Sequence, residues 1–327
     1  MKKIGITTTV PVEVIYASGN MPIDLNNILS SGEVDKYIEI AERDGFPKSM
    51  CAWIKGIYGV CLSEGVSEII GVLEGDCSNT ASLVEILKLK GISVVDFSYP
   101  KSRDLEDIKK NFKKFMKSFG VSQLEVESWR DRLNIIREKV KELDELSKEG
   151  KISSKDSHLF QVSCSDFWGN PDNFEKEVEN KLWEARQKKS QGKVIRLAYL
   201  GVPPLAGDIY EYIESKGAIV VFNEVQREFA FPRWRNAKNI FEQYLDYTYP
   251  YGMDFRLEKL EKDLELRQID GVIHYTQKFC HRILDNIVLK DKLTYPFINI
   301  EIDREQKLDE RTKLRLDSFI EMIGDMM

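Results

Sequence analysis

Apolar runs alternate with amphipathic stretches in the last third of the chain. The runs occupy residues 194–200, 219–222, 271–275 and 297–300, and helical patterns follow at about 205–215, from about 279 and from about 310. The first helical pattern stops at Lys216-Gly217, a typical helix C-terminus. Because the short runs are apolar throughout, the pattern predicts the strands of a parallel α/β sheet.

A shorter version of this pattern occupies the first third. An apolar run at 69–73 precedes a helical pattern at about 78–90, and a second strand is predicted at 92–97. Helical patterns at about 33–43 and 49–63 come before this unit. We therefore predict an N-terminal α/β domain with a helical start at 1–115 and a C-terminal α/β domain at 192–327.

The section between these domains, residues 116–191, is predicted to be helical. An apolar stripe with steps of four and three residues runs along it, and charged side chains surround the stripe: Trp129, Leu133, Ile136, Val140 and Leu143. A coiled-coil partner is one interpretation, but the stripe is too short for it. We expect a helix that packs on the domains or bridges them, with a linker at 188–192.

An aromatic segment at 223–255 fits no regular element. Arginines are interspersed with its rings, which are Phe229, Phe231, Trp234, Phe241, Tyr244, Tyr247, Tyr249 and Tyr251. The favoured interpretation is a helical insertion whose rings form a small core of their own. The alternative is a lid or a partner surface at the carboxyl edge of the sheet, with arginines and rings that suit a nucleotide-bearing ligand.

Composition and charge narrow the class of protein. The 327 residues are 42% hydrophobic and 31% charged, which is typical of a globular chain, and 48 basic against 54 acidic residues give a net charge of −6. An acidic balance argues against nucleic acid as a partner. No apolar run reaches the roughly 18 residues of a membrane span, and the first eight residues are too polar for a signal peptide. We expect a cytoplasmic protein.

Five cysteines, at positions 51, 61, 77, 164 and 280, are the main candidates for chemistry. In a reducing compartment such cysteines are buried, metal-binding or catalytic rather than paired in disulfides. Cys51, Cys77 and Cys280 each precede a predicted helix, and the last two also follow a predicted strand. Ligands of α/β sheets bind beyond the carboxyl ends of strands, and a helix N-terminus there favours thiolate over thiol.

Three converging thiolates would hold three irons of a 4Fe–4S cluster and leave the fourth iron open for chemistry. The competing interpretation is that these cysteines are small apolar core residues. Cys61 lies about three turns after Cys51 on the same predicted helix, so we expect it in the core. Cys164 has no strand end beside it, and core packing is favoured over a role as a fourth ligand or a ligand to a second cluster.

Motifs along the whole chain resemble one protein family. Residues 11–22, Pro-Val-Glu-Val-Ile-Tyr-Ala-Ser-Gly-Asn-Met-Pro, look like an opening of the form P-x-E-[LI]-I-x-A-x-G-x-x-P. Cys51 and Cys77 are similar to that family's first two cluster cysteines, and residues 270–280 resemble the segment that carries the third. Residues 194–221 and 312–321 are similar to the start of its second domain and to its closing helix. The family is that of 2-hydroxyacyl-CoA dehydratase and benzoyl-CoA reductase subunits, of the 2-hydroxyglutaryl-CoA dehydratase D-component type.

The resemblance implies two flavodoxin-like parallel-sheet domains joined by a helical section, with a 4Fe–4S cluster bound by Cys51, Cys77 and Cys280. It also implies a dimer with a sister subunit or a second copy, and a separate ATP-hydrolysing iron–sulfur activator. In the dehydratases one low-potential electron turns the thioester carbonyl of an acyl-CoA into a ketyl radical anion, which expels the 2-hydroxyl group. The sequence has no G-x-x-x-x-G-K-[ST] loop, so the energy of ATP would come from the partner.

Two other functions remain open at this point. One is a homodimeric reductase of small molecules that carries a double-cubane cluster, and the other is a non-catalytic structural or electron-carrier subunit. The sequence departs from the family pattern beside the second cysteine, where Asp76 precedes Cys77 and Ser78 follows it, whereas the family has Asp after the cysteine. Substrate identity therefore does not transfer.

Several polar groups have two interpretations each. The loop from Gly201 to Gly207 either cradles a CoA phosphate or is an ordinary strand-to-helix turn, and the turn is favoured. His274 and His281 flank the third cysteine's segment and are either proton shuttles or, as favoured, structural groups. Glu13 belongs to the site or to the polar surface, and the sequence does not decide between them.

Overall fold

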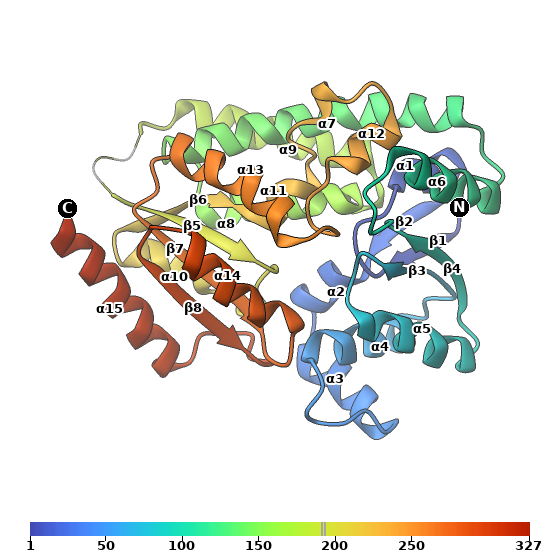
Figure 1. Cartoon of the computed structure of the whole chain (residues 1–327), viewed down its shortest axis with the longest axis horizontal. Coiled ribbons are helices and arrows are strands. Elements are labelled where there is room, and N and C mark those ends of the chain that lie inside the picture. The colour runs from blue at the N-terminus through green and yellow to red at the C-terminus, as the bar shows by residue number, and fades with distance from the viewer. Residues whose placement is uncertain (191, 193) are drawn as a thin grey trace. The chain divides into compact units, whose positions relative to one another are not determined.

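Two four-stranded parallel sheets organise the chain (Figure 1). The computed structural model describes residues 1–190, 192 and 194–327. The chain divides into two units: unit 1 comprises Met1–Glu138, Ser163–Glu175 and Phe231–Tyr251, and unit 2 comprises Lys139–Val162, Lys176–Ala230 and Gly252–Met327. The ranges 1–115, 116–191 and 192–327 stay a prediction, and Gln191 of the predicted linker lies outside the described residues.

The sheet of unit 1 has the order β2-β1-β3-β4, and all of its strands run parallel. Its strands are β1 (Lys3–Ile6), β2 (Met21–Asp24), β3 (Glu68–Glu74) and β4 (Ser93–Ser98). The helices are α1 (Val12–Ala17), α2 (Leu25–Ser31), α3 (Val34–Arg43), α4 (Ala52–Ser63), α5 (Ser78–Leu89), α6 (Leu105–Phe119) and α12 (Ile240–Leu245). Short 3-10 turns stand at Ser163–Ser165, Phe167–Gly169 and Trp234–Asn236.

Unit 2 repeats this arrangement with the order β6-β5-β7-β8, again all parallel. Its strands are β5 (Ile195–Gly201), β6 (Ala218–Asn223), β7 (Gly271–Gln277) and β8 (Phe297–Ile302). The helices are α8 (Ser154–Val162), α10 (Ile209–Ser215), α11 (Glu224–Phe229), α13 (Met253–Leu266), α14 (Asp285–Lys292) and α15 (Glu310–Met326), and the 3-10 turn η4 (His281–Leu284) precedes α14. The predicted fold class of two parallel-sheet α/β domains is confirmed.

The apolar runs became strands because both faces of the unit 2 sheet are covered. Alternate residues of β5 enter different cores: Leu197 and Tyr199 pack with α10 and α15, whereas Ala198 and Leu200 pack with α13 and α14. A strand that is buried on both faces has no polar alternation, which is why the sequence pattern was continuous.

The sequence pattern did not predict two strands of unit 1, β1 and β2. β1 has only four residues, and β2 reads Met-Pro-Ile-Asp. β2 lies at the edge of the sheet, where Pro22 is tolerated because a missing N–H costs no ladder bond on the open side. Its neighbour β1 is central and pairs with both β2 and β3.

Two long helices, α7 (Gln123–Lys148) and α9 (Pro171–Gln187), form most of the predicted helical section. The boundary between the two units falls inside both of them. The predicted stripe of α7 is buried at Leu133, Ile136, Val140 and Leu143, while Trp129 stacks on the ring of Tyr16 at a centroid distance of 4.9 Å.

The predicted aromatic segment 223–255 does not form a core of its own: Phe231–Tyr251 belongs to unit 1, and its two ends, with Phe229, belong to unit 2. Phe241 and Tyr244 pack edge-on against Phe112 of α6, with ring centroids 5.5 and 5.3 Å away. The ring of Tyr247 lies 6.0 Å from that of Tyr99, and its hydroxyl donates to Thr9 Oγ1. The segment therefore covers the loop that follows β1, at the carboxyl edge of this sheet.

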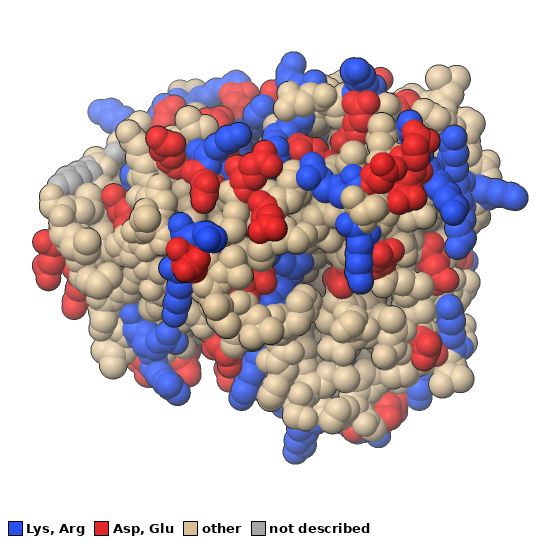
Figure 2. All heavy atoms as spheres, in the orientation of Figure 1, with Lys and Arg blue, Asp and Glu red and all other residues tan. Residues whose placement is uncertain are grey.

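Basic and acidic side chains are interspersed on the face that Figure 2 shows. This distribution agrees with the net charge of −6 and gives that face no broad basic patch of the kind that binds nucleic acid. In the described part of the chain, no helix is long and apolar enough to cross a membrane.

Candidate functional site

Cys77 stands at the N-cap of α5, directly after the end of β3. Gly75 makes the sharp turn between strand and helix with φ +89°, and a Cβ at this position would lie 2.7 Å from Tyr99 Cβ and 2.8 Å from Pro250 Cβ. The thiol makes no capping hydrogen bond to the helix. The neighbouring Asp76 carboxylate accepts from the Thr80 hydroxyl at 3.2 Å, so it turns toward its own helix.

Cys51 occupies the same position on α4. Its backbone is extended, with φ −48° and ψ 124°, and its side chain is buried without a capping hydrogen bond. A turn closed by Met50 N–H to the Pro47 carbonyl brings the chain to this N-cap. The first N–H groups of a helix have no partner within the helix, so the N-cap is a position where an anionic side chain is favoured.

Cys280 is the N-cap of η4, three residues beyond the end of β7. Its N–H donates to the Gln277 carbonyl at 3.0 Å, and its carbonyl accepts from Ile283 N–H at 3.1 Å. Phe279, the residue before it, has φ +62° and a side chain that is 48% exposed. A left-handed conformation is unfavourable for a bulky L-residue, so this turn holds Cys280 at an energetic cost.

Phe279→Gly should therefore raise the free energy of unfolding by up to about 1 kcal/mol, since glycine adopts positive φ without strain. The exposed ring gives up little packing. Denaturant unfolding measures the change, and Leu284→Gly, which replaces another exposed side chain at a position without positive φ, should destabilise instead. Equal destabilisation by both variants would show that the turn stores no strain.

The other two cysteines are buried in the interior of unit 1. Cys61 is inside α4 and Cys164 lies in a 3-10 turn, each with 1% of its surface exposed. Burial raises the pKa of both thiols to about 12. At neutral pH they are thiols rather than thiolates, which is the state expected for core residues.

The three N-cap cysteines are divided between the units. Unit 1 carries Cys51 and Cys77 and unit 2 carries Cys280, so neither unit by itself contains all three. Among the described residues, no three His, Cys, Asp or Glu side chains are grouped to hold a metal ion. The donor chemistry nevertheless fits an iron–sulfur cluster, since each sulfur is a potential thiolate at a helix start and none caps its own helix.

A family model for the 2-hydroxyglutaryl-CoA dehydratase D-component matches residues 7–323. The chain belongs to this family. It has no significant match among curated proteins. The match covers the N-cap cysteines, the strands from β2 to β8 and the helical section, so it confirms the family that the sequence motifs resembled.

In this D-component relative, the loop after β5 has the contacts of an ordinary strand-to-helix turn. Leu205 N–H donates to the Tyr275 hydroxyl at 3.1 Å, and Gly207 N–H donates to the Gln306 carbonyl at 3.2 Å. These backbone groups already have partners within unit 2, which favours the structural interpretation over a phosphate cradle.

The two histidines near Cys280 differ in their surroundings. His274 is fully buried in β7, where its Nδ1 lies 2.6 Å from Asn286 Oδ1, and burial lowers its pKa. His281 directly follows Cys280, and burial together with Arg282 lowers its pKa. Both imidazoles are therefore neutral near pH 7.

Glu13 is neither surface nor exposed site. It is fully buried in unit 1, where Oε1 accepts from Arg137 Nη1 at 2.7 Å and Oε2 accepts from the Tyr244 hydroxyl at 2.7 Å. The sequence analysis did not single out Arg137. A usable signal exists, because Arg130, Asn134 and Arg137 repeat the spacing of four and three residues along one side of the apolar stripe.

A second feature that the sequence did not reveal is a pair of buried carboxyl groups in unit 1. Asp24 N–H donates to Asp166 Oδ2 at 2.8 Å, and the Ser165 hydroxyl donates to Asp24 Oδ2. Burial and then the charge of Asp24 raise the pKa of Asp166 to about 7. The pair anchors a turn in which Phe167 and Trp168 both have positive φ.

The pH dependence of folding should report this pair. A folded pKa of about 7 for Asp166 lies above the unfolded value near 3.9, so its contribution to stability is complete below pH 4 and is lost as the pH rises through 7. Asp24→Asn removes the neighbouring charge, and the Ser165 hydroxyl can turn to accept from the new amide. The variant should lose less stability between pH 4 and 7, by up to about 1 kcal/mol.

The measurement is the difference between variant and wild-type unfolding free energies at each pH. This difference removes the effect of other groups, such as buried His158, whose pKa is lowered to about 3 and whose contribution has the opposite sign. Asp172→Asn, at a side chain that is 81% exposed, is the control. Parallel curves for Asp24→Asn and wild type would refute an effect of the Asp24 charge on the pKa of Asp166.

Proposed function

We propose that this chain is the iron–sulfur subunit of an activator-dependent enzyme of the dehydratase or reductase type. Cys51, Cys77 and Cys280 would hold a 4Fe–4S cluster through three of its irons. When bound, the cluster supplies single electrons to a substrate at its open iron. The family membership supports a dehydratase-type subunit in general terms, and the electron transfer and the ligand set are our proposal.

The observation that carries the proposal is the shared position of the three cysteines. Each is an N-cap residue, each has extended backbone angles, and none makes a side-chain cap bond. Serine, threonine, aspartate and asparagine are the usual N-cap residues because their oxygens accept from the first helical N–H groups. A cysteine at this position in three separate helices stabilises those helices poorly, so a role for the sulfur is the simpler explanation.

Residues around the cysteines would support the proposed cluster site. A helix N-terminus offers backbone N–H groups and partial positive charge, which suit a thiolate that binds a metal better than a thiol. Gly75 and Phe279 set the turns that deliver Cys77 and Cys280 to the helix starts.

The proposed partners are inferred from the family and from the absence of an ATP-binding motif in the sequence. The sequence has no phosphate-binding loop of the G-x-x-x-x-G-K-[ST] type, so we propose that a separate ATP-hydrolysing iron–sulfur activator delivers the electron. We also propose a dimer with a sister subunit or a second copy, an acyl-CoA substrate, and a reducing cytoplasm. A reducing compartment keeps cysteines available as thiols for metal binding.

Anaerobic purification of the full chain, with iron and acid-labile sulfide counts, tests the proposal. We expect about four irons and four sulfides per chain and a broad visible absorbance that bleaches on reduction. About eight irons per chain would indicate a double-cubane reductase instead. Colourless, iron-free protein after reconstitution with iron and sulfide would indicate a structural subunit and overturn the proposal.

A further inference from the structure

A buried polar network in unit 1 contains more hydrogen-bond donors than acceptors. Gln243 Oε1 accepts from Arg130 Nε and Asn134 Nδ2, both at 2.9 Å. Asn134 Oδ1 accepts from Arg137 Nη1 at 2.9 Å, and the same nitrogen donates to Glu13 Oε1 at 2.7 Å. The four residues Glu13, Asn134, Arg137 and Gln243 are at most 1% exposed. The network therefore joins α1, α7 and α12 without contact to bulk water.

Three nitrogens of this network have no hydrogen-bond partner among the residues that the structure describes. They are Nε and Nη2 of Arg137 and Nε2 of Gln243. Every one of them carries only donors, because a guanidinium accepts no hydrogen bond and an amide nitrogen accepts none either. A buried unpaired donor costs about 1–3 kcal/mol, so the network is built to meet an acceptor.

The open atoms of Arg137 form one edge of its guanidinium. The guanidinium carbon lies over the ring of Phe231 at 4.7 Å and over that of Phe167 at 5.3 Å. Such ring contacts occupy the faces of the group, while its hydrogen bonds leave in the plane. Because Glu13 engages only Nη1, the Nε–H and Nη2–H pair keeps the fork geometry that matches the two oxygens of a carboxylate.

We propose that this network is a binding site for a small carboxylate ligand, held by the Nε and Nη2 edge of Arg137. A cation is excluded because every open group is a donor. Phosphate is disfavoured relative to a carboxylate because a dianion would bring twice the negative charge beside buried Glu13, while the fork of Arg137 matches the two oxygens of a monoanion. The inference goes beyond the proposed function, since it involves none of the cysteines.

Titration of the full chain with sodium formate tests the site, because formate is the smallest carboxylate. Formate should raise the thermal midpoint in a saturable way, while sodium chloride at equal ionic strength should not. Arg137→Lys keeps the positive charge beside Glu13 but removes the fork. The apparent dissociation constant for formate should rise at least tenfold in this variant.

A second variant keeps the test valid if Arg137→Lys does not fold. Gln243→Glu retains an acceptor for Arg130 and Asn134 but places a negative charge in the network, so it too should weaken formate binding at least tenfold. Arg132→Lys, on the same helix with a side chain that is 31% exposed, is the matched control and should bind like wild type. No saturable formate effect beyond that of chloride, or unchanged binding in Gln243→Glu, would overturn the proposal and assign ordered water to the open donors.

Discussion

Cys77→Ser should reduce the iron content of the anaerobically purified chain from about four atoms to near zero. The hydroxyl of serine does not ionise at neutral pH, whereas the thiolate of cysteine is the form that binds iron. Misfolding would not explain a loss of iron from Cys77→Ser. Cys77 makes no cap bond to α5, and serine is among the best N-cap residues, so the apoprotein should be as stable as before or up to about 1 kcal/mol more stable.

The same reasoning applies to Cys51→Ser and Cys280→Ser, which also change N-cap residues. Cys61→Ser is the matched control, because Cys61 lies inside α4, the helix that Cys51 caps, and is buried there. This variant should keep its iron and lose some stability through the buried hydroxyl. Iron and sulfide counts with circular dichroism separate the two effects. Equal iron loss from Cys61→Ser and Cys77→Ser would refute the ligand assignment.

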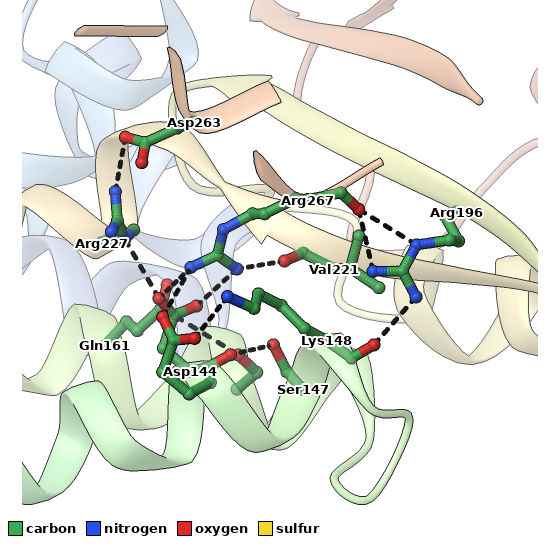
Figure 3. A network of polar contacts seen from close by, with 11 residues as sticks. Asp144, Ser147, Lys148, Gln161, Arg196, Val221, Arg227, Asp263 and Arg267 are labelled. Atoms are coloured by element: carbon green, nitrogen blue, oxygen red, sulfur yellow. Dashed lines mark hydrogen bonds and ion pairs between the residues drawn. The ribbon is translucent and has the colours of Figure 1, made fainter. Parts of the chain in front are cut away.

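Asp144→Asn should lower the free energy of unfolding by about 3–5 kcal/mol, because it leaves buried Arg267 without its closest carboxylate and Arg227 with only that of Asp263. Figure 3 shows Asp144 of α7 facing Arg227 and Arg267, all within unit 2. Oδ1 accepts from Arg267 Nη1 at 3.0 Å and from Gln161 Nε2 at 2.8 Å, and Oδ2 accepts from Arg227 Nε at 3.0 Å. The side chains of Asp144 and Arg267 are 3% and 2% exposed.

Burial by itself would raise the pKa of Asp144, but the two guanidiniums outweigh it and the pKa is lowered. The stabilisation is therefore present above the unfolded pKa near 3.9 and is lost as the pH falls through the lower folded value. Glu142→Gln is the control, because Glu142 pairs with Arg186 where both side chains are about half exposed. It should cost less than about 1 kcal/mol in urea unfolding. A cost this small for Asp144→Asn would mean that water reaches the arginines.

The proposed ligand site and the Asp144 network each join residues that lie far apart in the sequence. Arg137 and Glu13 are 124 residues apart, and Arg267 and Asp144 are 123 residues apart. Arg137 lies in α7, a helix that the apolar periodicity predicted, whereas Arg267 follows α13, which the sequence pattern did not predict. A periodicity reports which face of a helix is buried, but it does not report which polar side chain from elsewhere enters the same interior.

The aromatic segment also packs against residues that are distant in the sequence. Its rings predicted a core, and they do pack in one. They share that core with Phe112 of α6 and Tyr99 after β4, so the segment belongs to unit 1 although it follows the second strand of unit 2. The many aromatic side chains indicate that the segment will be buried. Which core buries them depends on the path of the chain in the tertiary structure.

The sequence by itself determined the elements of local origin. Runs of apolar residues became the strands β3 to β8, Lys216-Gly217 marked the end of α10, and three cysteines were placed at helix starts. These features depend on neighbours within a few residues, so they can be read along the chain. Only the tertiary structure decided that Glu13 is buried against Arg137, that Asp24 and Asp166 share one environment, and which segments make up each unit. Those pairings come from chain segments far apart in sequence, and their energy depends on burial that exists only after folding.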